Sequence, residues 1–265
     1  MFNIFTEIPS TLLTVYFVIF GLLLGSFANV VIYRWPLGLS VVKPRSHCFQ
    51  CKNLVRWYDN IPVLSWLWLR GKCRHCKAQI SIRYPLVEIL MGALFGWVYV
   101  EYGWTFTTLE YCIFIFGLVT ASFIDIDHFL LPDVITLSGI IIGVLGSLIN
   151  PERTLVDSLL GVVLGGGFLW SVAYFYFVFR KEEGMGGGDI KLLAWIGAIL
   201  GFKAIPFVIL TSTILGSVFG VILNWKSKEG LKSVIPFGPY LALGALIHIF
   251  GGKGLGEWYF SLFFP

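Results

Sequence analysis

The sequence predicts an all-α polytopic membrane protein with about eight transmembrane helices and one small polar loop. Of its 265 residues, 57% are hydrophobic and only 13% are charged, whereas soluble domains carry about 25% charged residues. The apolar residues form long continuous runs without the alternation of a barrel strand. Because backbone groups cannot be left unpaired in lipid, these runs are expected to be helices.

Eight apolar runs are bounded by charged residues or by Gly and Pro. A helix needs about 20 residues to cross a bilayer, so the sixth run is short and the fourth and eighth are marginal. No Lys or Arg precedes Arg34, so the first run lacks the basic start of a secretory signal peptide and is expected to be a retained span. The runs are 11–32, 84–100, 107–124, 133–149, 155–179, 190–201, 204–225 and 235–250.

Positive charge is concentrated in the loop after the first run. Ten of the 19 Lys and Arg lie between Arg34 and Arg83, against one acid, Asp59. Cytoplasmic loops carry such an excess, so this loop is expected inside and the N-terminus outside. With eight alternating spans, fifteen Lys and Arg fall inside and three outside. The charge therefore reports orientation in membrane lipid, and no nucleic-acid partner is expected.

Three pairs of glycines have small-xxx-small spacing, which permits close contact between helices. We assign them packing roles only, because a chain with 30 glycines contains such pairs by chance. The pairs are Gly21/Gly25, Gly139/Gly143 and Gly161/Gly165.

The polar loop contains two C-x-x-C pairs. Cys48/Cys51 and Cys73/Cys76 have 21 residues between them, close to the spacing of zinc ribbons. Four thiolates close the coordination shell of one Zn, so a structural rather than a catalytic ion is predicted. A redox pair or inert cysteines are the alternative, and disulfides conflict with a cytoplasmic loop. Cys112 lies in an apolar run and is expected to be a buried hydrophobe.

Two aspartates mark a candidate catalytic pair, because ionisable residues at the edge of lipid are costly. Asp125 ends the third run, and Asp189 begins the sixth after three glycines, 186–188. The predicted topology puts both on the cytoplasmic side, where their carboxyl groups can share a proton as in an aspartyl protease. The glycines remove side chains and permit unusual backbone angles, so that a substrate backbone could approach closely.

Each aspartate also has a structural alternative. Asp125 could be a helix-end acid facing the headgroups, and Asp189 a helix N-cap. Asp127 is expected to be solvated, while Asp133 has the position of a cap for the next helix. Because Asp189 would lie at a helix N-terminus and Asp125 at a C-terminus, Asp125 is expected to carry the shared proton.

Several motifs together resemble the bacterial type 4 prepilin peptidases, over nearly the whole chain. The resemblance implies a G-x-G-D aspartyl protease of the bacterial cytoplasmic (inner) membrane, with Asp125 and Asp189 as the catalytic pair. Its substrates would be type IV prepilins or pseudopilins, cut just after a Gly at the cytoplasmic face. Besides the two cysteine pairs, the motifs are 25–36, 57–62, 70–73, 83–88, 124–133 and 186–191.

The resemblance further implies that the new N-terminal residue, usually Phe, is methylated with S-adenosylmethionine as donor. Gly71 and Lys72 are carried over as methyltransferase residues, against the alternative of a turn glycine and a solvated lysine. No Rossmann-type glycine fingerprint supports this activity from the residues themselves. The expected organisation is a first helix (1–33) and a cysteine loop (34–83) for methyl transfer, followed by a peptidase region (84–265).

Three other functions compete with this interpretation. An ion-coupled transporter or channel would use the acids for cations or protons, but leaves the cysteine loop unexplained. A non-enzymatic zinc-bearing membrane scaffold would tolerate replacement of both aspartates. A signal-peptide-type intramembrane protease keeps the enzyme class, and the cysteine loop argues against it.

Overall fold

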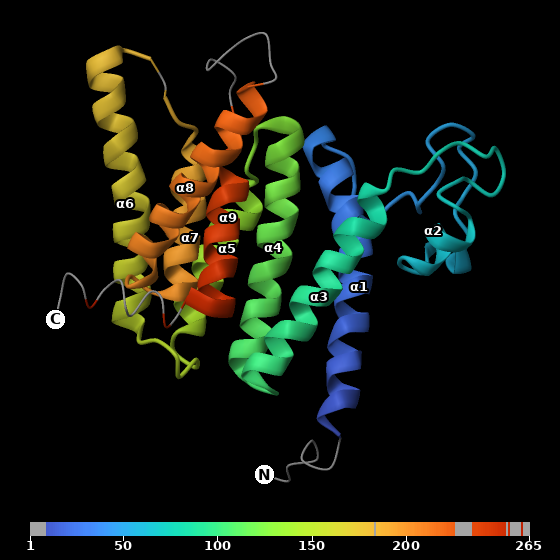
Figure 1. Cartoon of the computed structure of the whole chain (residues 1–265), viewed down its shortest axis with the longest axis horizontal. Helices are drawn as coiled ribbons and strands as arrows, with labels where there is room; N and C mark the ends of the chain where they lie inside the picture. Colours follow the sequence, from blue (N-terminus) through green and yellow to red (C-terminus); the bar gives the residue numbers. More distant parts are fainter. Residues whose placement is uncertain (1–8, 183, 226–234, 253, 255–260, 262–265) are drawn as a thin grey trace. The chain divides into compact units, whose positions relative to one another are not determined.

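The computed structural model describes residues 9–182, 184–225, 235–252, 254 and 261. Within these ranges all regular structure is helical, and the only strand-like pairing is two isolated bridges (Figure 1). The predicted all-α class is therefore confirmed for this part of the chain. Two compact units divide the chain, Met1–Phe116 and Gly117–Pro265.

Two long helices form the frame of the first unit: α1 (Ser10–Arg34) and α3 (Arg83–Tyr102) pack side by side (Figure 1). Glycine brings them together, since a Cβ added to Gly21 would lie 2.6 Å from the carbonyl oxygen of Met91. The chain between them forms a cysteine module, residues 35–82. It contains the short helices η2 (Trp35–Leu37), η3 (Trp57–Asn60) and α2 (Leu64–Trp68).

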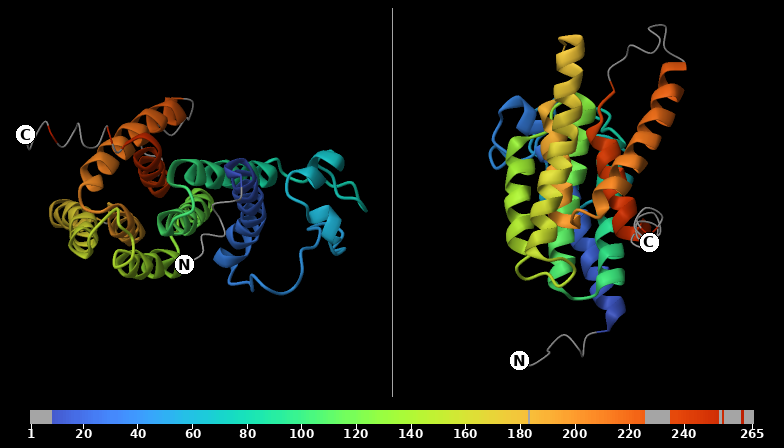
Figure 2. Two further views of the ribbon diagram at one scale, coloured as in Figure 1. Left: turned by 90° about the horizontal axis from the view of Figure 1, so that it is seen from below. Right: turned by 90° about the vertical axis from the view of Figure 1, so that its left-hand side faces the viewer.

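The second unit begins within α4 (Phe106–His128) and consists otherwise of helices α5 to α9. They are α5 (Asp133–Gly146), α6 (Leu155–Arg180), α7 (Gly187–Leu200), α8 (Ala204–Trp225) and α9 (Gly238–Ile247), which continues into the π-helical turn η5 (His248–Gly252). The short helix α7 is the core of this unit, because every residue from Leu192 to Ile199 is buried. Helices α5 and α6 pack against it (Figure 2).

The glycine pairs have the packing roles that their spacing predicts. Gly25 faces the Cα of Glu88 on α3, and Gly143 faces Ala198 on α7. Gly161 meets the backbone of Gly197 so closely that any Cβ would overlap its carbonyl oxygen. These contacts let α7 lie deep between its neighbours.

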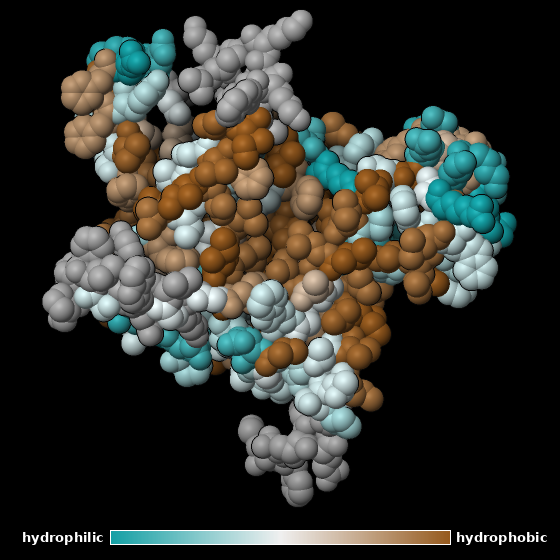
Figure 3. Space-filling view, viewed as in Figure 1, coloured by the Kyte–Doolittle hydropathy of each residue, from teal (hydrophilic) through white to brown (hydrophobic). Residues whose placement is uncertain are grey.

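Hydrophobic surface covers much of the helical part of the molecule (Figure 3). Among the described residues, five helical segments are long and apolar enough to cross a membrane: Ser10–Leu37, Arg83–Tyr102, Phe106–His128, Leu155–Arg180 and Ala204–Ile222. Two shorter apolar helices are Asp133–Gly146 and Gly238–Gly251. Each of the eight predicted runs forms one helix, but the predicted count of eight spans is not confirmed.

Candidate active site and metal centre

Asp125 lies in the last turn of α4, and its carboxyl group is buried with only 5% of the residue exposed. Its Oδ2 accepts a hydrogen bond of 3.1 Å from the backbone N–H of Gly238, the first residue of α9. The first N–H groups of a helix have no partner within it and favour an anion. The alternative that Asp125 faces the headgroups is therefore wrong.

Asp189 lies in the first turn of α7, where the N-cap is Gly186 and no side chain caps the helix. Its Oδ1 is buried and has no hydrogen-bond partner among the residues that the structure describes. An unpaired buried polar group costs about 1 to 3 kcal/mol and calls for an explanation. The N-cap alternative is therefore wrong, and the free oxygen favours a chemical role.

Leu131 joins the two aspartate segments. It is buried in the loop between α4 and α5, and its side chain contacts both Gly188 and Gly238. A Cβ on Gly188 would lie 2.9 Å from the Cβ of Leu131, and one on Gly238 would lie 3.2 Å from its Cδ2. Through this contact the start of α7, the start of α9 and the end of α4 meet, and the Asp125 charge acts on Asp189.

The glycines before Asp189 matter because they lack side chains, and not because their backbone angles are unusual. None of Gly186, Gly187 and Gly188 has a positive φ, so the expectation of unusual angles is wrong. Among the described residues, no atom would lie within 4 Å of a Cβ on Gly186 or Gly187, whereas Gly188 is crowded by Leu131. Open space therefore lies beside Asp189, as close approach of a substrate backbone requires.

The expectation that Asp125 carries the shared proton assumed that no helix N-terminus was near it. In the structure, the N-terminus of α9 does lie at Asp125, and its first N–H donates a hydrogen bond to that carboxyl group. A buried oxygen of Asp189, in contrast, lacks a donor among the described residues. The geometry thus favours Asp125 as the anion and Asp189 as the proton carrier, the reverse of that expectation.

The other acids of this region have different surroundings. Asp133 is the first residue of α5 rather than its cap, and it pairs with Nζ of Lys191 at 2.6 Å. Asp127 is exposed, as predicted.

Sequence reasoning missed three residues of the site: Gly238, Leu131 and Ser122. Ser122 lies one turn before Asp125 on α4 and has a buried hydroxyl without a hydrogen-bond partner among the described residues. Its i, i+3 spacing from Asp125 is the signal that could have found it. Nothing local connects Gly238 to Asp125, because 113 residues separate them.

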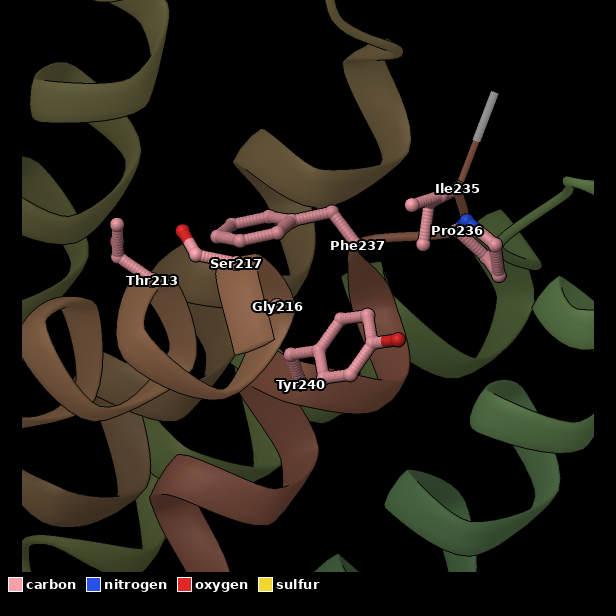
Figure 4. A pocket seen from close by; sticks show the side chains of 7 residues that line it. All are labelled: Thr213, Gly216, Ser217, Ile235, Pro236, Phe237 and Tyr240. Atoms are coloured by element: carbon pink, nitrogen blue, oxygen red, sulfur yellow. The ribbon is translucent and has the colours of Figure 1, made fainter. Parts of the chain in front are cut away.

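A small cavity of about 230 Å³ lies next to the Asp125 contact, between α8 and the start of α9 (Figure 4). Phe237, directly before Gly238, lines it, and its ring extends toward Ser217 (Figure 4). The other lining residues are Thr213, Gly216, Ile235, Pro236 and Tyr240.

All four cysteine sulfurs of the two C-x-x-C pairs lie within 4.8 Å of one another in the cysteine module. The Sγ atoms of Cys48 and Cys76 are 3.7 Å apart, and those of Cys51 and Cys73 are 4.0 Å apart. Tetrahedral Zn with bonds of about 2.3 Å would set neighbouring sulfurs about 3.8 Å apart. The four thiols therefore fit a tetrahedral metal ion.

Two matching backbone loops hold the thiols. In the first, the Lys52 N–H donates to the carbonyl of Cys48, and in the second the Lys77 N–H donates to the carbonyl of Cys73. Both lysines have a positive φ near 60°, and an isolated bridge flanks each loop, His47 with Leu54 and Lys72 with Gln79. Each C-x-x-C pair therefore lies in a hairpin-like knuckle, as in the zinc ribbons whose spacing it resembles.

The electrostatics of the module differ between the two cysteine pairs. The N–H groups of Cys51 and Gln50 lower the pKa of the Cys48 thiol to about 6. The Ala78 N–H also lowers the pKa of Cys76, but desolvation and the neighbouring sulfurs outweigh it and raise that pKa to about 11. A bound cation would offset the repulsion between the sulfur charges.

Next to this cluster, Arg74 donates bidentate hydrogen bonds to Asp59, with Nη2 at 2.6 Å from Oδ1. This contact holds the pKa of Asp59 below its usual range.

Gly71 and Lys72 lie between α2 and the second knuckle. Gly71 has a φ of +65°, and a Cβ there would lie 2.8 Å from the indole of Trp66, so a turn role accounts for this glycine. The side chain of Lys72 is exposed. A role for either residue in methyl transfer stays a prediction.

The fold and these sites define a helical membrane protein with a buried pair of carboxyl groups in one unit and a four-thiol site in the other. Residues 19–102 match the family described as the bacterial peptidase A24 N-terminal domain, and residues 112–221 match the type IV leader peptidase family. The chain belongs to the type IV leader peptidase family.

Its relatives include proteins named prepilin leader peptidase/N-methyltransferase. The one from Aeromonas salmonicida is 38% identical over 92% of each chain, and the one from Pseudomonas aeruginosa is 38% identical over 91% of each. The Burkholderia pseudomallei relative is 32% identical over 94% of this chain and 88% of its own. No solved structure matches the chain.

Proposed function

We propose that this protein removes the leader peptide of type IV prepilins or pseudopilins and methylates the new N-terminus. The observation that carries the peptidase function is the meeting of Asp125 and Asp189 at one end of the second unit, with one buried Asp189 oxygen unpaired among the described residues. Membership of the leader peptidase family and the names of the relatives support the substrate class. The transporter and scaffold alternatives explain neither the meeting of the two carboxyl groups nor the membership of the leader peptidase family.

In the proposed mechanism, the Gly238 N–H holds Asp125 as the anion that takes a proton from the attacking water. Asp189 donates its proton to the carbonyl oxygen of the scissile peptide bond as the water oxygen bonds to carbon. The tetrahedral intermediate collapses as Asp125 donates the proton it took from water to the leaving amine and the C–N bond breaks. Asp189 takes back a proton from the gem-diol as the C=O bond re-forms, so both carboxyl groups return to their starting states. Open space at Gly186 and Gly187 admits the substrate backbone beside Asp189.

The proposed topology places all eight apolar helices in the bacterial inner membrane, with the N-terminus outside. The cysteine module and the carboxyl pair then face the cytoplasm. Support comes from the ten Lys and Arg between Arg34 and Arg83.

For the first part of the chain, we propose that Cys48, Cys51, Cys73 and Cys76 hold one structural zinc ion in a zinc-ribbon-like loop. The fit of the four sulfurs to a tetrahedron supports this. We further propose that residues 1–33 and 34–83 serve methyl transfer from S-adenosylmethionine and that 84–265 form the peptidase region. The names of the relatives support the second activity.

The test is mass spectrometry of a prepilin coexpressed with the wild type, Asp125→Asn, Asp189→Asn or the matched control Asp133→Asn. Both site variants should leave the leader in place, because each removes one partner of the proton transfer, while Asp133→Asn, which breaks only an exposed ion pair, should cleave normally. A gain of about 14 Da on the mature N-terminus, one methyl group, would report the transferase. Leader loss with either membrane-inserted site variant would exclude the aspartyl mechanism.

A further inference from the structure

The cysteine module presents an apolar face to the surroundings of the protein. On α2, Leu64 is 63% exposed, Leu67 58% and Trp68 85%, and in η3 Trp57 is 75% exposed. Positions 64, 67 and 68 have i, i+3 and i+4 spacing and therefore share one side of the helix. We call Trp57, Leu64, Leu67 and Trp68 the α2 face.

The other side of α2 packs inward. Trp66 donates its indole N–H to the carbonyl of Ile80 at 3.1 Å, and its ring lies against Gly71. The exposed apolar side chains therefore belong to an ordered helix that is held in place by contacts of Trp66. They lie on the side of the helix away from Trp66, which is half-buried.

A hydrogen bond sets the height of α2 along the membrane-spanning helices. The Val63 N–H, directly before α2, donates to Oε2 of Glu88 at 2.7 Å. Glu88 is buried, five residues into α3, which is about 7.5 Å from the start of that helix. A Cβ on Gly25 would lie 2.7 Å from its Cα, and Gly25 is nine residues, about 14 Å, before the end of α1.

The start of α2 thus lies beside the two spans rather than beyond their ends. Interfacial helices bury an apolar face about 5 to 10 Å into the boundary between headgroups and acyl chains. The Glu88 contact sets the start of α2 at a comparable distance, about 7.5 Å, from the start of α3. Trp at such a depth is typical of membrane interfaces.

Two exposed basic residues flank the segments of the α2 face in the sequence. Arg56 precedes η3 and Arg70 follows α2, and both are exposed. The one acid between Arg34 and Arg83, Asp59, is paired with Arg74. Hydrophilic residues cover the upper and outer surface of the module (Figure 3). An apolar face in a module with exposed Arg56 and Arg70 and an excess of basic residues complements anionic lipid headgroups.

We propose that the α2 face docks on the lipid surface of the same membrane that α1 and α3 cross, at the leaflet where α1 ends, with anionic phospholipid as its partner. This contact holds the cysteine module flat against the bilayer instead of free in solution. The proposal goes beyond the peptidase function and depends only on α1 and α3 spanning the membrane.

The experiment places a photoreactive benzophenone amino acid at Trp68 of the full-length protein, in nanodiscs that contain anionic phospholipid. The matched control carries it at Asn53, an exposed residue of the first knuckle. That knuckle stands at the end of α1, because the Phe49 ring packs on Tyr33 with centroids 4.7 Å apart. Irradiation should give lipid adducts at 68 and only background at 53.

Two further variants test the height of α2. Glu88→Gln keeps an oxygen that accepts the Val63 N–H, so the lipid adducts at 68 should persist. Glu88→Leu removes the acceptor, so the adducts should fall toward the level at 53. The proposal is overturned if 68 forms no lipid adducts, if 53 forms as many, or if Glu88→Leu retains the full yield. Crosslinks from 68 to a coexpressed prepilin in place of lipid would also overturn it, in favour of substrate docking.

Discussion

At the scale of single residues, the surroundings of Asp125 show how a carboxylate is held at the end of a long apolar helix. Its partner is the backbone N–H that begins α9, and no basic side chain is needed for this contact. A backbone donor at a helix start is fixed in position by the helix itself, so it holds the carboxylate without ordering a long side chain.

Gly238→Ala should slow leader cleavage about 100-fold, because an added Cβ would lie 2.7 Å from Oδ2 of Asp125 and must displace it. A shift of about 1 Å in a reacting group costs on this order. The measurement is the single-turnover rate in detergent, with Gly251→Ala as control, since no atom of the residues that the structure describes lies within 4 Å of a Cβ there. Equal rates for the two variants would show that the Asp125 contact has no role in cleavage.

The glycines around the site show two different uses of the same residue. Gly188 is crowded by Leu131, whereas Gly186 and Gly187 have open space around an added Cβ. The G-x-G-D pattern therefore combines a packing requirement directly before Asp189 with clearance for a substrate one turn earlier.

At the scale of helices, α7 is positioned by backbone contact. It is 14 residues long and carries Asp189 at one end, and α6 approaches it through Gly161 and Gly197 with no side chain between the two backbones. Without an aqueous phase to drive helices together, such close van der Waals packing is a main source of association in lipid.

Gly161→Ala should lower the free energy of unfolding by about 1 to 3 kcal/mol, the usual cost of overpacking. The matched control is Gly167→Ala on the same helix, where an added Cβ meets nothing within 4 Å. That change should stabilise the protein by about 0.5 to 1 kcal/mol, because Ala is the better helix residue. Unfolding in mixed micelles measures both, and a neutral Gly161→Ala would mean that α6 and α7 are farther apart.

At the scale of the whole molecule, the two proposed chemistries belong to different compact units. The four thiols lie in Met1–Phe116, and both aspartates lie in Gly117–Pro265. The α4 helix continues from one unit into the other, so the chain connects them within a single apolar helix.

The purified protein should contain one metal ion per chain, and its removal by a chelator should expose the module cysteines to a maleimide. The internal control is Cys112, which is 4% exposed in α4 and should stay unreactive throughout. Counting labelled cysteines by mass spectrometry checks both statements. If the four module cysteines react at the same rate before and after chelation, they hold no metal.

The sequence alone predicts most of the helices, the four-thiol cluster and the two candidate aspartates of this protein. Apolar runs with no alternation can only be helices in lipid, so every predicted run corresponds to a helix. The two C-x-x-C pairs predict a four-thiol cluster, because the spacing itself encodes two knuckles. The two aspartates at the ends of apolar runs stand out by their cost in lipid, and the family motifs surround them.

Only the tertiary structure decided what surrounds these groups. The Gly238 N–H on Asp125, the Leu131 contact with two helix starts and the Glu88 contact with Val63 each join segments that no local pattern connects. Periodicity and spacing report how one segment folds, whereas these contacts depend on which helices pack together and at what height. That is why the sequence could single out both aspartates, whereas the assignment of the proposed shared proton to one of them depends on contacts between helices.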